Sequence, residues 1–192
     1  MYQIWKNKEF RPKTEYVILC QAKNTRETRF AHFNPILIKS TMQYTWGYWQ
    51  EYYMEDLKRR KLPCHYYVEY LDKDYVVFQG LSEEYPSYFI RELVEAGIIK
   101  SEYKNAILVT IGENYNIDIP EFRMYEQMCS KCLCSLMRRY KLNQERIVYF
   151  DEILDPNWEV MLKQSNLTYD IETTSNFDRV ILRQFLDYYK HN

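Results

Sequence analysis

The chain has 192 residues and a formal net charge of −1, with 46% hydrophobic and 28% charged residues. This length and composition predict one soluble globular domain with a sizeable core. The near-neutral charge argues against a dominant nucleic-acid surface, and no run approaches the roughly 18 apolar residues of a membrane span. The charged first ten residues do not resemble a secretory signal, and the five cysteines are an odd number. We therefore expect a cytoplasmic protein, or one carried inside a virion or particle.

Three strands are predicted in the first half of the chain. The segment "TEYVILCQA" (14–22) is a continuous apolar run between polar turns, which is typical of a buried strand. Segments 65–71 and 75–81 flank the polar residues 72–74. This arrangement predicts a β-hairpin.

A helix is predicted between the first strand and the hairpin, over residues 42–61. It places Trp46, Trp49 and Tyr53 at helical spacing, and Pro63 ends it. An aromatic stripe of this kind either packs in the core or lines a groove for a glycan or a peptide.

The second half alternates strands and helices. Residues 105–113 predict a buried strand, residues 120–142 the strongest helix of the chain, and residues 145–154 a further strand. A terminal helix is expected from about Phe177. Together the elements predict an α/β fold, with a central mixed sheet flanked by helices and an added C-terminal helix.

Four segments, in this order, resemble the zinc N-acetylmuramoyl-L-alanine amidases, the family that includes phage amidase lysozymes and peptidoglycan-recognition proteins. They are "RPKTEYVILCQAKNT", "LPCHYYVEYLDKDYVVFQG", "NAILVTIGEN" and "YEQMCSKCLCSLMRRYKLNQERIVYFDEILDP". The resemblance implies one domain over residues 1–192, with an amidase-like core at 11–160 and an extension at 161–192 that carries the terminal helix.

The resemblance also implies where the family's zinc site would lie. In the family, two His and one Asp or Cys hold zinc and leave one coordination position open to water. Those ligands correspond to Cys20, Phe150 and Asp155 of this chain. Cys64 takes the place of an assisting Tyr, and His65 that of a non-ligand His. We call these five residues the cleft positions.

The small number of histidines supports the loss of the zinc site. The chain contains only His32, His65 and His191, and Phe150 has no lone pair to offer a metal. We therefore expect no zinc and no other cofactor. A reactive thiol formed by Cys20 and His65, with Asp155 nearby, is a further hypothesis that requires an exposed cysteine of depressed pKa.

Two other polar groupings have simpler interpretations. Cys129, Cys132 and Cys134 are expected to be small apolar residues of a helix rather than metal ligands, because Cys134 lies about 200° further round the helix than Cys132. Asp151 and Glu152 are expected to point to opposite sides of a solvated strand end.

Two classes of function follow. The first is a catalytically inactive amidase-like domain that acts as a binding or scaffold protein for a protein partner or a muropeptide, with Trp46, Trp49, Tyr53 and Tyr66 as binding residues. The second is a hydrolase of peptidoglycan amide bonds with a cysteine-based or rearranged metal site. The histidine supply favours the first class, and an origin in a phage or mobile element fits both.

Overall fold

The structure is a computed structural model that describes residues 14–22, 64–71, 74–79, 81, 83–111, 119–167, 171–172 and 179–191. The predicted helix at 42–61, and with it Trp46, Trp49 and Tyr53, lies outside the described residues. Within these ranges, no helix is long and apolar enough to cross a membrane.

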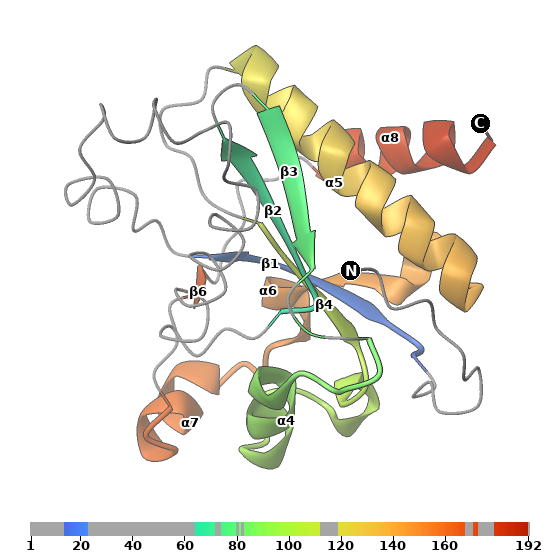
Figure 1. Ribbon diagram of the computed structural model, residues 1–192. Coiled ribbons are helices and arrows are strands. Elements are labelled where there is room, and N and C mark those ends of the chain that lie inside the picture. Colours follow the sequence, from blue (N-terminus) through green and yellow to red (C-terminus); the bar gives the residue numbers. More distant parts are fainter. Residues whose placement is uncertain are drawn as a thin grey trace, which may run out of the picture.

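A mixed sheet forms the centre of the fold, with strand order β3-β2-β4-β1-β5 (Figure 1). Strands β2, β4, β1 and β5 are parallel, β3 is antiparallel to β2, and β6 pairs with the end of β1. The strands are β1 Val17–Ala22, β2 Tyr66–Leu71, β3 Asp74–Gln79, β4 Ile107–Ile111, β5 Ile147–Tyr149 and β6 Ile171–Glu172. The predicted α/β class, the hairpin and the two buried strands are confirmed.

Helices lie on both faces of the sheet. In Figure 1, α5 and α8 lie on one side, and α4 and α7 lie on the other. The helices are α4 Tyr88–Glu95, α5 Ile119–Tyr140, α6 Phe150–Ile153, α7 Trp158–Gln164 and α8 Arg179–His191. The predicted long helix and terminal helix are therefore confirmed.

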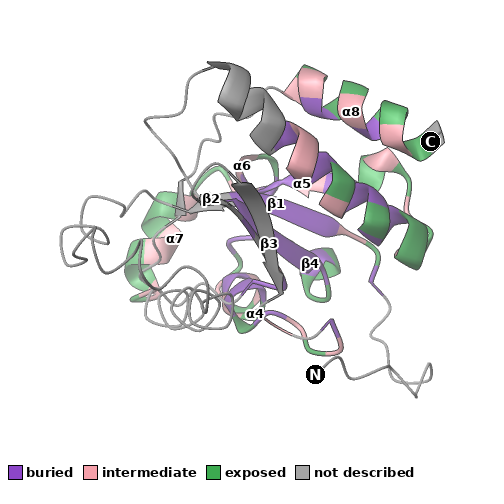
Figure 2. Ribbon diagram, turned by 45° about the horizontal axis from the view of Figure 1, so that its top comes forward, coloured by how far each residue is buried: buried purple, intermediate pink, exposed green. Residues whose placement is uncertain are grey.

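Two apolar clusters fill the space between the sheet and its helices. Successive side chains of a strand point to opposite faces, so β1 contributes to both clusters. Its residues Ile18 and Cys20 belong to the cluster beneath α4, which we call the α4-side cluster, together with Phe89 and Phe150. The other cluster, beneath α5 and α8, includes Leu182 of α8. The described residues of β1 and β4 are coloured as buried in Figure 2, and these strands lie between the helices.

The strand predicted at 145–154 is confirmed only over Ile147–Tyr149, because Gln144–Arg146 form a short 3-10 helix before it. Strand β5 ends at Tyr149, and Phe150 begins the short helix α6. Asp151 and Glu152 occupy the first turn of α6, where the partial positive charge of a helix N-terminus favours acidic residues. Both carboxylates bind Arg179 of α8. They therefore converge on one cation instead of pointing to opposite sides.

Helix α4 is an element that the sequence analysis missed. The Ser87 hydroxyl accepts a hydrogen bond from Ile90 N at 3.5 Å and caps the helix N-terminus. Gly97 adopts a φ of 74°, in the left-handed region that glycine tolerates. Ile98 N donates to Leu93 O at 2.9 Å, which completes a Schellman motif at the C-terminus.

Candidate functional site

Two of the cleft positions are buried thiols, one within strand β1 and one just before strand β2. Cys20 Sγ lies 3.2 Å from Thr110 Oγ1 on the neighbouring strand β4. Cys64 precedes β2, and its carbonyl accepts a hydrogen bond from Leu81 N at 2.9 Å. Both cysteines belong to the α4-side cluster. Burial raises the pKa of the Cys20 and Cys64 thiols to about 12, despite a hydrogen bond to Thr110 that lowers it.

These thiols are expected to resist alkylation in the folded protein. Near neutral pH, a thiol with a pKa of about 12 has roughly a thousandfold less thiolate than an ordinary cysteine, and the thiolate is the nucleophile. Native protein treated with iodoacetamide should leave Cys20 and Cys64 unlabelled in peptide mass mapping, whereas guanidinium-unfolded protein should be labelled at both. Rapid native labelling of Cys20 would revive the reactive-thiol hypothesis.

His65 is a buried histidine with both ring nitrogens in use. Its Nδ1 accepts a hydrogen bond from Leu108 N at 2.9 Å, so Nε2 carries the proton and donates to Tyr85 O at 2.8 Å. Burial lowers the pKa of His65, although the bond to Tyr85 and the nearby Glu83 act against it. The neutral ring therefore joins β2, β4 and the segment before α4. Its only lone pair is already engaged with Leu108, so it is poorly placed to serve as a base or a metal ligand.

Phe150 and Asp155 occupy the remaining cleft positions, and they have different surroundings. The Phe150 ring packs on Phe89 with centroids 5.9 Å apart, inside the same cluster as Cys20 and Cys64. Asp155 is only partly buried, and its Oδ1 accepts a hydrogen bond from Asn157 N at 2.8 Å. Three cleft positions thus share one apolar cluster, while the Asp155 carboxylate caps its own turn. Among the residues that the structure describes, no group of three His, Cys, Asp or Glu side chains could hold a metal ion.

The three cysteines of α5 are consistent with a helix core. Helix α5 runs without a break from Ile119 to Tyr140. Cys129 and Cys134 are buried, and Cys132 is half-buried. The interpretation of these residues as small apolar side chains is confirmed for Cys129 and Cys134.

A buried carboxylate, Glu83, is the polar centre that the sequence analysis missed. Only 5% of its side chain is exposed. Tyr66 Oη and Arg139 donate to Oε1, and Tyr140 Oη donates to Oε2. Burial would raise the pKa of Glu83, but the hydrogen bonds from Tyr140, Tyr66 and Arg139 outweigh it and lower the pKa. Tyr66, one of the expected binding residues, has its hydroxyl engaged with this carboxylate.

Comparison of the sequence with protein-family models and with curated proteins finds no match. The resemblance to the zinc amidases therefore remains a hypothesis that rests on the four segments quoted above.

Proposed function

We propose that this chain is a catalytically inactive, amidase-like domain that acts by binding a protein partner or a muropeptide. The proposal rests on the apolar surroundings of two of the cleft positions. Cys20 and Phe150, which stand where the resemblance places two zinc ligands, lie in one apolar cluster with Phe89. A catalytic zinc needs three ligands with lone pairs and an open position for water.

The altered-hydrolase alternative receives less support. A cysteine nucleophile needs an exposed thiol of lowered pKa next to a base. Cys20 is buried with a raised pKa, and the His65 nitrogens are bound to backbone groups. An origin in a phage or mobile element remains part of the proposal, because the family that the four segments resemble includes phage amidase lysozymes.

Incubation of the purified full chain with purified peptidoglycan tests the proposal. We expect no release of stem peptides above the level of a heat-inactivated sample, with or without added zinc. Release of stem peptides that a chelator abolishes would overturn the inactive assignment. Co-sedimentation with the same peptidoglycan separates the two binding modes, because a muropeptide-binding protein sediments and a protein-binding scaffold stays in the supernatant.

A further inference from the structure

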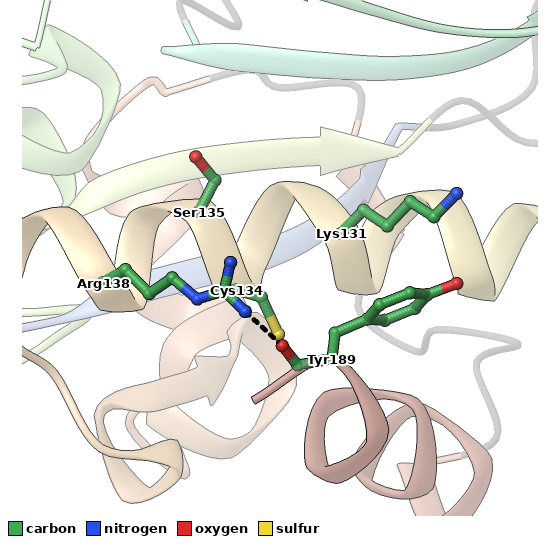
Figure 3. A pocket seen from close by; sticks show the side chains of 5 residues that line it. All are labelled: Lys131, Cys134, Ser135, Arg138 and Tyr189. Carbon is green, nitrogen blue, oxygen red and sulfur yellow. Dashed lines mark hydrogen bonds between the residues drawn. The ribbon is translucent and has the colours of Figure 1, made fainter. Parts of the chain in front are cut away.

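A groove lies between α5 and α8, on the opposite face of the sheet from the cleft positions. Its volume is about 310 Å³ (Figure 3). Lys131, Cys134, Ser135 and Arg138 of α5 line it together with Tyr189 of α8. The two charged side chains in this lining are cations, and none of the described residues that line the groove carries a carboxylate. The groove thus offers donors and positive charge to whatever enters it.

Tyr189 contacts both cations of this groove. Its hydroxyl accepts a hydrogen bond from Gln127 Nε2 at 2.6 Å, and its carbonyl accepts one from Arg138 Nη2 (Figure 3). Lys131 Nζ lies 5.5 Å from the centre of the Tyr189 ring. These contacts place both cations beside Tyr189.

The spacing of the cations defines the kind of ligand. Lys131 and Arg138 are seven residues apart, so they lie on one face of α5, about 10 Å apart along the helix axis. Each cation can therefore hold its own anionic group, and a ligand that carries two such groups uses both cations. An extended peptide advances about 3.4 Å per residue, so carboxylates two or three residues apart are separated by about 7–10 Å. Long Lys and Arg side chains can reach groups at this separation.

We propose that the groove between α5 and α8 binds an extended acidic segment of a protein partner. Arg138 would take one carboxylate through its planar guanidinium and Lys131 another, with the Ser135 hydroxyl between them. A nucleic acid fits less well, because such partners require a broader basic surface than the two cations of this groove. This inference rests on the proposed binding role and names the chemistry of the partner.

A labelled acidic peptide provides the test. The probe is a fluorescein-labelled peptide in which glutamate alternates with serine, and its control has glutamine at every glutamate position. In anisotropy titrations of the full chain, the glutamate peptide should bind and the glutamine peptide should not. Lys131→Gln should weaken binding about two- to fivefold, in line with one partly exposed ion pair. Lys163→Gln, at an exposed position on α7, removes the same charge and should leave binding unchanged.

Several outcomes would overturn the inference. The first is that the glutamate peptide does not bind. The second is that Lys131→Gln and Lys163→Gln weaken its binding equally, which would indicate general charge attraction. Full displacement by inorganic phosphate at matched ionic strength would indicate a single-anion site. Tighter Lys131-dependent binding to a single-stranded oligonucleotide or to anionic vesicles would assign the groove to another class of partner. None of these results depends on zinc content or peptidoglycan hydrolysis. The proposal for the groove and the proposal of an inactive cleft can therefore be refuted independently.

Discussion

Replacing Phe150 by alanine is expected to lower the free energy of unfolding by about 3–5 kcal/mol, the usual cost of removing a buried phenyl group. The side chain is only 5% exposed and packs on Phe89 within the α4-side cluster. Because Phe150 is buried in this cluster, its removal leaves a cavity in the core. Urea denaturation followed by circular dichroism measures the change.

Two further variants make this experiment specific. Phe150→Leu retains most of the apolar volume and should cost about 1 kcal/mol. Val160→Ala, on α7 at a side chain that is 55% exposed, should change stability by no more than about 0.5 kcal/mol. A loss below about 1 kcal/mol in Phe150→Ala would mean that the ring borders an open cleft, and the filled-cleft interpretation would then be wrong.

Glu83→Gln is expected to destabilise the fold by about 2–3 kcal/mol. The substitution removes the charge that Arg139 faces and one of the acceptors that Tyr66 and Tyr140 use. Because Arg139 is 40% exposed, water can partly replace the lost partner, and the expected cost stays below that of a fully buried pair. Thermal or urea unfolding of both proteins gives the difference.

A matched variant controls for the chemical change itself. Glu95→Gln alters a carboxylate that is 67% exposed and 3.8 Å from Arg91, so it should cost no more than about 0.5 kcal/mol. Equal effects of the two substitutions would show that the Glu83 cluster contributes nothing beyond a surface ion pair.

The lowered pKa of Glu83 also predicts a pH dependence. A carboxylate whose pKa is lower in the folded state contributes its stabilisation above its unfolded pKa, about 4.3 for Glu, and loses it as the pH falls through the folded value. The stability gap between the wild type and Glu83→Gln should therefore narrow as the solution is acidified below about pH 4.3. A gap that stays constant in acid would contradict this assignment.

The continuous apolar strands were the most predictable part of the fold. Residues 17–20 and 107–111 are buried on both faces, as continuous apolar runs predict for parallel strands under two layers of helices. The long helix and the terminal helix were predictable from their helical spacing of apolar residues. Helix α4 was missed, although Ser87 and Gly97 mark its two ends in the sequence.

The second half of the 145–154 segment shows where a local pattern misleads. The run from Ile147 to Phe150 is apolar throughout and looks like one strand, but the chain turns into α6 at Phe150. The acidic pair that follows was a usable signal, because Asp and Glu are favoured in the first turn of a helix.

The Glu83 cluster could not be predicted from the sequence. Its partners Arg139 and Tyr140 lie 56 and 57 residues further along the chain, and only the packing of α5 against the sheet brings them together. The same holds for Asp151 and Glu152, whose shared partner Arg179 comes from α8. The five cleft positions rest on the resemblance of the four quoted segments, and the structure places Cys20, Cys64 and Phe150 in one cluster.

The zinc content of the purified full chain is the most direct test of the inactive-cleft proposal. The protein is dialysed exhaustively in buffer without chelator, and its metal is measured by elemental analysis against protein concentration. We expect far less than one zinc per chain, because Cys20 and Phe150 lie in an apolar cluster and the His65 lone pair is engaged. One zinc bound per chain would contradict the proposal and make metal-assisted hydrolysis the leading function.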